Sequence, residues 1–223
     1  MDLFNIYTSP NSFFTKIAEK PKWLIPLILV VVFSVLLSLV AITKTDWETQ
    51  KTKVRELLEK QNVPPERIEK IIAAINPKTG LVRGLIAVLI ITPLGILIFT
   101  TILNLMIPLL GTSGSFKKTL AVTTNSALIR IPSAIVKVVL MLLKGSSDVT
   151  TSLILFFPKM SDKGFIYGLF SRIDFFTIWE LLLVALGLKI LFNIPGKKTY
   201  YTVFGIWLLY VIISSIFPTR FGG

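Results

Sequence analysis

The chain has 223 residues, of which 53% are hydrophobic and only 16% are charged, whereas soluble domains carry about 25% charged residues. This much apolar surface excludes a soluble globular domain and, despite a net charge of +12, a nucleic-acid-binding protein, so the composition indicates an integral membrane protein. The sequence contains no Cys and no His, which excludes disulfides, thiolate chemistry and Ser–His catalysis.

The segment before the first long apolar stretch, residues 1–23, is expected to form a helix on the membrane surface. Pro10 suits the first position of a helix, and Phe13 and Phe14 then lie on an apolar face, with Trp23 at the entry to the bilayer. This pattern predicts an interfacial helix on an anionic leaflet, anchored by Phe13, Phe14 and Trp23. A short disordered tail is the alternative.

Five apolar segments are long enough to cross a bilayer. At about 1.5 Å per residue, roughly 20 residues cover a hydrocarbon core about 30 Å thick. The second segment is longer than this and contains Pro93 and Pro108, where we expect kinks. The expected spans are residues 24–42, 81–110, 119–143, 175–192 and 199–217.

The polar block between the first two spans, residues 43–80, is expected to lie outside the membrane. Mixed charges and good helix formers run from Asp46 to Lys60, and Pro64-Pro65 interrupts them. Isoleucines at helical spacing follow. We expect a small extramembrane helical hairpin; a solvated charged spacer is the alternative.

Residues 144–174 are expected to form the long loop before the fourth span. Their apolar run 153–158 is too short to cross a bilayer, so it lies in the interface or forms a shallow re-entrant segment. Asp174 directly precedes the fourth span and is expected to cap that helix. Trp179, one turn further on, is expected to belong to an aromatic belt at the membrane surface.

Lysines in the short connections predict the orientation of the chain. The N-terminal tail, the turn before the third span and the turn before the fifth span fall on one side of a five-span protein. Under the positive-inside rule this side is cytoplasmic. We therefore expect a protein of the cell membrane with its N-terminus in the cytoplasm and its C-terminus outside. These lysines are Lys16, Lys20, Lys22, Lys117, Lys118, Lys197 and Lys198.

The third expected span carries a polar stripe. Its members recur every three or four residues and fall within about an 80° arc of a helix. An Arg at the centre of a bilayer costs about 2.5–3.5 kcal/mol, so the stripe should face the bundle interior or a water-filled cavity. The stripe consists of Thr119, Thr123, Ser126, Arg130, Ser133 and Lys137.

Depth along the spans indicates partners for this stripe. Counted from the outer surface, Lys137 and Glu180 lie at the same level, so we expect them to form an ion pair. Arg130 lies deeper, with Asn104 of the second span within its reach. The stripe either holds helices together through hydrogen bonds worth about 0.6 kcal/mol each or lines a binding or conduction path; a Lys137 that snorkels without a partner is a third alternative.

Pro132 in the same span leaves the carbonyl of Leu128 free for a donor from elsewhere. The sequence shows no phosphate-binding loop, no acidic metal cluster and no well-placed pair of carboxylates. We expect no enzymatic activity, no cofactor and no metal.

Four stretches of the chain resemble the Yip domain family, polytopic membrane proteins named for their interaction with Ypt/Rab GTPases. SPNSFFTKIAEKPKWLIP is similar to the family's Pro-x-x-Phe-Phe-x-x-Ile entry, and LLGTSGSFKKTLAV leads into a third span with a proline. RIDFFTIWELLLVALGL is similar to the Asp-x-Phe-x-x-Trp pattern of the short prokaryotic members, and a lysine-rich turn precedes an apolar helix with Trp207.

The resemblance implies an all-α bundle of five transmembrane helices with a cytoplasmic N-terminus and a non-enzymatic role. We expect a membrane-organising or protein-interaction function, with anionic lipid headgroups, other membrane proteins or a second copy of the chain as partners, and no nucleic acid. The alternative is a transporter, channel or lipid-translocating protein whose path is lined by Arg130, Asn104, Lys137 and Glu180.

Overall fold

The computed structural model describes residues 3–157, 160 and 164–216, and within them the chain is built from helices without named strands. The expected all-α fold is confirmed, and five helices are long and apolar enough to cross a membrane. In chain order the elements are α1 (Asn5–Thr8), α2 (Pro10–Glu19), α3 (Leu24–Thr43), α4 (Trp47–Lys60), α5 (Pro65–Ala73), α6 (Pro77–Met106), η1 (Pro108–Leu110), α7 (Phe116–Ser126), η2 (Ala127–Ile129), α8 (Arg130–Lys144), η3 (Leu153–Phe156), α9 (Phe165–Arg172), α10 (Phe175–Phe192) and α11 (Gly196–Ile216).

The candidate spans are apolar runs, and residues that interrupt a helix set their ends and breaks. Pro93 lies inside α6, while Pro108 ends the α-helical part and opens the short turn η1. The third span consists of α7 and α8, joined by the single 3₁₀ turn η2. Phe217, the expected end of the fifth span, and residues 1–2 of the expected surface helix lie outside the described residues.

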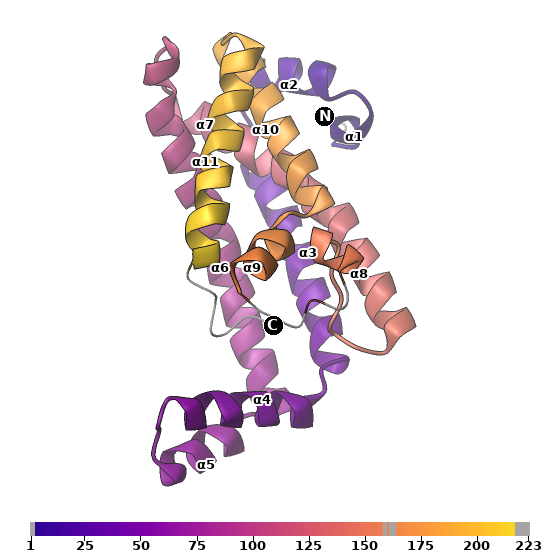
Figure 1. The fold of residues 1–223 in the computed structure, drawn as a ribbon. Coiled ribbons are helices and arrows are strands. Elements are labelled where there is room, and N and C mark those ends of the chain that lie inside the picture. The colour runs from indigo at the N-terminus through magenta and orange to yellow at the C-terminus, as the bar shows by residue number, and fades with distance from the viewer. Residues whose placement is uncertain (1–2, 158–159, 161–163, 217–223) are drawn as a thin grey trace.

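Two sets of helix contacts build the bundle, and α7, which packs on both α6 and α10, connects them. α3 packs against α6 and α8, whereas α10 packs against α11 and α7. As Figure 1 shows, α2 lies at one end of the bundle and the hairpin of α4 and α5 at the other. α10 and α11 occupy the half nearer to α2, and α3 and α6 continue beyond them to the hairpin.

The N-terminal helix α2 packs on protein, which corrects the expectation that Phe13 and Phe14 are lipid anchors. Their side chains are 1% and 0% exposed and belong to the main hydrophobic core. The contact is close because α10 carries Gly187 there: a Cβ at Gly187 would lie 2.7 Å from Val122 and 2.9 Å from Phe14. An apolar helix face fits a protein groove as well as a membrane surface, and here the groove is present.

The two tryptophans named as anchors keep partial exposure. Trp23 immediately precedes α3 and packs against the core. Trp179 on α10 contacts the ring of Tyr7, with centroids 6.3 Å apart, and the ring of Phe175, 6.0 Å away. A role for Trp23 and Trp179 at the membrane surface remains a prediction.

The expected helical hairpin is present at the end of the bundle opposite α2 (Figure 1). Asp46 caps α4 by accepting hydrogen bonds from the backbone N–H groups of Glu48 and Thr49, each 3.1 Å long. An ion pair of 2.8 Å joins Arg55 on α4 to Glu69 on α5. Charged surfaces and local caps thus stabilise a unit that contributes little to the core.

The loop before α10 turns back into the bundle. From the end of α8 the chain returns to η3 and α9, which lie near the start of α10 and beside the end of α11 (Figure 1). This position favours the re-entrant alternative for residues 153–158, although Pro158 itself lies outside the described residues. Because of this return, α10 begins inside the bundle and not at its end.

Candidate functional site

The polar stripe of the third span divides into two halves at η2. Thr119, Thr123 and Ser126 on α7 are at most 2% exposed and lie inside packed protein. Arg130, Ser133 and Lys137 on α8 line a cavity. The same spacing of three or four residues therefore gives a buried half on α7 and a cavity-lining half on α8, because different elements pack against the two helices.

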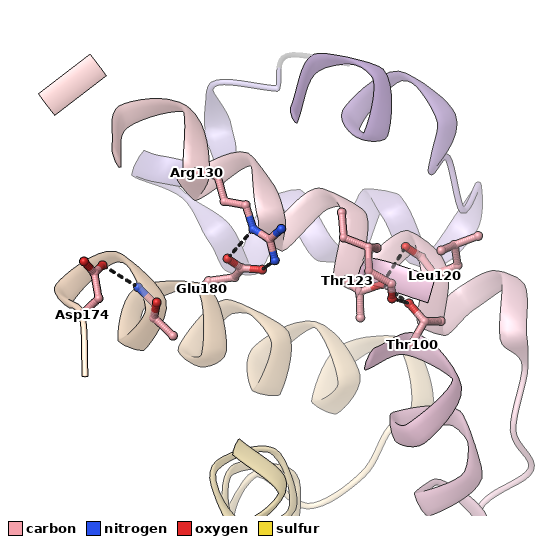
Figure 2. Close-up of polar contacts among 8 residues, drawn as sticks. Thr100, Leu120, Thr123, Arg130, Asp174 and Glu180 are labelled. Atoms are coloured by element: carbon pink, nitrogen blue, oxygen red, sulfur yellow. Dashed lines mark hydrogen bonds and ion pairs between the residues drawn. The ribbon is translucent and has the colours of Figure 1, made fainter. Parts of the chain in front are cut away.

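The α7 half is dry and hydrogen-bonded to α6. The hydroxyl oxygens of Thr100 and Thr123 lie 2.6 Å apart and share a hydrogen bond, while Thr123 also bonds the backbone carbonyl of Leu120 (Figure 2). Thr119 donates to the side-chain oxygen of Asn104 at 3.0 Å. Asn104 therefore accepts a hydrogen bond from Thr119, which corrects the prediction that it lies within reach of Arg130.

Thr100 is a residue of this cluster that the sequence analysis missed. It is fully buried, and it lies four residues before Asn104, so the two share a face of α6. That spacing within an apolar span was the available signal. Ser126, in contrast, is buried with its hydroxyl unpaired among the described residues.

An ion pair lines the cavity at the start of α8, directly after the dry half and η2. Arg130 donates from Nε to Glu180 Oε2 at 3.0 Å and from Nη2 to Oε1 at 2.8 Å (Figure 2). The planar guanidinium matches the carboxylate with two parallel hydrogen bonds, a geometry that Lys cannot provide. The Glu180 side chain keeps 14% of its surface exposed.

This pairing corrects the expected Lys137–Glu180 ion pair. Counting residues from the membrane surface placed Glu180 level with Lys137, on the assumption that α10 begins at that surface. Because the chain first returns through η3 and α9, α10 begins deeper in the bundle (Figure 1). Glu180 consequently pairs with Arg130. Lys137 makes no hydrogen bond or ion pair with any residue that the structure describes.

Two further contacts position the walls of the site. Asp174 caps α10 by accepting from the N–H groups of Phe176 and Thr177 at 2.9 and 3.3 Å, and it also accepts from the Thr151 hydroxyl. Arg172 donates to the carbonyls of Gly168 and Ser214 at 2.8 and 2.9 Å, and so attaches the end of α9 to α11. Arg172 was not among the residues expected at the site.

The backbone carbonyl of Leu128, which Pro132 leaves without a helical N–H donor, accepts a hydrogen bond from a residue far away in the chain. The hydroxyl of Tyr7, on α1, donates to the oxygen of Leu128 at 2.8 Å. Burial raises the pKa of Tyr7 above its ordinary value, which keeps the hydroxyl protonated as a donor. The N-terminal segment therefore stabilises the turn at which the stripe changes from dry to open.

The cavity measures about 860 Å³ and is half-open. One wall comes from α3, α6 and α8, and the other from α10, α11 and the returning loop. Its lining combines apolar side chains with five charged ones: Arg130, Lys137, Arg172, Asp174 and Glu180. Among the described residues, no group of three His, Cys, Asp or Glu side chains gathers to hold a metal ion.

Comparison with known proteins gives one family match and one similar membrane protein. The model of the Yip1 domain family matches residues 4–217. The chain is similar to membrane protein YknW of Bacillus subtilis (strain 168), with 25% identity over 221 residues that cover 96% of this chain and 90% of that protein. No solved structure matches the chain.

Proposed function

Because the chain belongs to the Yip1 domain family, we propose that it is a non-enzymatic protein that organises the membrane by binding membrane components. The family match and the five candidate spans support an integral membrane protein. The proposal adds that the intramembrane cavity holds a component and does not conduct one. Partners of this kind are anionic lipids, other membrane proteins or a second copy of the chain.

One observation carries this proposal: the polar stripe is closed on the side of α2. Thr100 and Thr123 bond to each other there, fully buried or nearly so, and Thr119 bonds Asn104. The lining of the cavity includes Arg130 but none of these α7 residues. A blind cavity is suited to binding, whereas conduction requires a polar path through the whole membrane.

Transport or lipid translocation is the second candidate function, since a cavity of about 860 Å³ contains the charged groups of Arg130 and Lys137. Proteoliposomes separate the two functions. We expect wild type and Arg130→Leu to give the same flux of chloride and of a fluorescent phospholipid as protein-free vesicles. Flux above background in wild type that Arg130→Leu loses, and that the exposed control Arg83→Leu keeps, would establish transport instead.

The proposed orientation places the N-terminus in the cytoplasm, the C-terminus outside and the chain in the cell membrane. It is supported by the gathering of α2 and of the turns before α7 and α11 at one end of the bundle (Figure 1), because these segments carry the lysines of the positive-inside rule. The hairpin of α4 and α5 then lies outside.

The absence of Cys from the sequence makes this orientation simple to test. On intact cells, a membrane-impermeant maleimide should label Gln61→Cys in the hairpin and leave Ser113→Cys, in the turn before α7, unlabelled. The opposite pattern would reverse the orientation. Labelling of both variants after permeabilisation serves as the control for reactivity.

A further inference from the structure

We propose that the cavity is a binding site for one anionic phospholipid, with the headgroup phosphate at Lys137 and an acyl chain leaving sideways along α6. This inference rests on the proposed function, since it names the membrane component that is held. It is argued from four observations: the charges of the lining, its unpaired hydroxyls, its depth and its opening.

The charge that remains unpaired in the cavity is positive. The carboxylate of Glu180 is occupied by Arg130, and that of Asp174 by the first N–H groups of α10 and the Thr151 hydroxyl. The guanidinium of Arg172 bonds backbone carbonyls, which leaves its positive charge without a counter-ion in the part of the chain that the structure describes. Lys137 has no partner among the described residues, so the lining favours an anion.

Neutral donors accompany this lysine. Ser133 lies one turn before Lys137 on α8 and is 7% exposed, and Thr92 faces the cavity from α6. Neither hydroxyl forms a hydrogen bond with the residues that the structure describes. A phosphate group accepts several hydrogen bonds at once, so a cavity lined by an ammonium group and by two hydroxyls without partners among the described residues supplies suitable donors for it.

The depth of Lys137 is that of a lipid headgroup and not of the bilayer centre. Lys137 precedes Lys144, the last residue of α8, by seven residues, which corresponds to about 10 Å along the helix. A lysine side chain extends its charged end toward the interface. Its ammonium group is therefore positioned near the level at which phospholipids carry their phosphates.

The opening of the cavity is apolar and faces the surrounding lipid. Three isoleucines of α6 that line it, Ile91, Ile98 and Ile102, remain 65%, 52% and 40% exposed. Tyr210 of α11 lines the opposite side and is 62% exposed. In a membrane such a surface contacts acyl chains, so a phospholipid enters laterally with its headgroup at Lys137 and its chain against α6.

The cavity volume agrees with an occupant of this kind. Its value of about 860 Å³ lies within the roughly 300–1,000 Å³ of known ligand pockets. The headgroup and the first part of a chain fill such a volume, while the rest of the lipid stays in the bilayer.

Native mass spectrometry of the full chain in detergent tests the site with phosphatidylglycerol and, as a zwitterionic probe with the same acyl chains, phosphatidylcholine. We expect wild type to retain one phosphatidylglycerol and to bind phosphatidylcholine more weakly. Lys137→Leu should weaken phosphatidylglycerol binding about tenfold, as expected for the loss of a hydrogen bond to a charged group. The control Lys144→Leu, on the same helix but outside this cavity, should change it less than twofold.

A second pair of variants tests the cavity without changing charge. Gly95 lines the cavity and a Cβ added there meets no atom within 4 Å, so the side chain of Gly95→Leu is expected to occupy part of the cavity. The matched control is Gly205→Leu on α11, which is equally unhindered but outside the lining. Gly95→Leu should lose the bound lipid, whereas Gly205→Leu should keep it, with unfolding temperatures reported for both.

Two results would overturn the site: equal binding of both lipids by wild type, or unchanged lipid retention in both Lys137→Leu and Gly95→Leu. Either result, obtained together with background flux in the proteoliposome assay, removes the lipid site and leaves the proposed binding function standing. Flux that depends on Arg130 removes the proposed function irrespective of the lipid measurement. The two proposals therefore fail separately.

Discussion

Arg130 on α8 and Glu180 on α10, which both line the cavity, face each other with two parallel hydrogen bonds, 3.0 and 2.8 Å long (Figure 2). The pair connects the third and fourth candidate spans where the dry half of the polar stripe meets the open half. It neutralises both charges at this depth, where an isolated charge is costly. Lys137 is thereby left, among the described residues, as the charged side chain of the lining that has neither a hydrogen bond nor an ion pair.

The first prediction concerns the coupling within this pair. Removing either partner leaves an unpaired charge, so Arg130→Leu and Glu180→Leu should each lower the free energy of unfolding in detergent by about 2 kcal/mol. This is less than the roughly 3–5 kcal/mol of fully buried pairs, because the Arg130 side chain is 41% exposed. The double variant should cost at least about 1 kcal/mol less than the sum.

The matched cycle combines Lys137→Leu with Glu180→Leu. Since these residues do not pair, their effects should add within about 0.5 kcal/mol. Coupling in the second cycle and additivity in the first would contradict the observed arrangement and restore the ion pair expected from the sequence.

The polar arc could be predicted from the sequence, but the choice of partner could not. Spacing along one helix predicts which residues share a face, and in the structure Arg130, Ser133 and Lys137 of the predicted arc line one cavity. Pairing across helices depends on where the next helix begins, and α10 begins deep because η3 and α9 return into the bundle. No periodicity in residues 144–174 reports that return.

The N-terminal helix shows the same limit of sequence patterns. Phe13 and Phe14 form an apolar face that can pack equally well against lipid or against protein. The environment is decided by a surface on two other helices, at Val122 of α7 and Gly187 of α10, each more than a hundred residues away in the chain. By contrast, the cap at Asp174 depends on residues that follow it directly in the chain, so it could be predicted from the sequence alone.

The second prediction concerns Tyr7, whose hydroxyl donates a hydrogen bond to the backbone carbonyl of Leu128. Tyr7→Phe keeps the ring against Trp179 and removes the donor, so the carbonyl is left unsatisfied and unfolding should become easier by about 1–2 kcal/mol. The control is Tyr201→Phe, an exposed ring on α11, which should stay within about 0.5 kcal/mol. Equal stability of both variants in thermal unfolding would show that this hydrogen bond contributes nothing.

The third prediction tests the close packing of α2 on α10. Gly187→Ala places a Cβ 2.7 Å from Val122 and 2.9 Å from Phe14, and overpacking of this kind costs about 1–3 kcal/mol. Gly205→Ala meets no atom within 4 Å and should be neutral or stabilise the helix by up to about 1 kcal/mol. Limited proteolysis should also release residues near α2 faster in Gly187→Ala. Similar behaviour of the two variants would contradict the docked position of α2.

The fourth prediction is a pH dependence of the hairpin, set by the cap at Asp46. The hydroxyl of Thr49 donates to this carboxylate at 2.6 Å, and with the N–H groups of Thr49 and Glu48 it lowers the pKa of Asp46 below its ordinary value. The folded hairpin therefore favours the ionised form. The stabilisation is complete above the ordinary Asp pKa of about 3.9 and is lost as the pH falls through the lowered value.

Hydrogen exchange of the α4 amides between about pH 6 and pH 2.5, corrected for the intrinsic rate, measures this loss. Wild type should lose protection in the first turn of α4 as the pH falls. Asp46→Asn caps the helix without titrating, so its protection should fall less steeply, and the difference between the two isolates Asp46 from the other acids of the hairpin. Parallel pH profiles of wild type and Asp46→Asn would show that the charge of Asp46 does not stabilise α4. If, in addition, Asp46→Ala loses protection at all pH values while Asp46→Asn keeps it, the cap acts through hydrogen bonding and not through its charge.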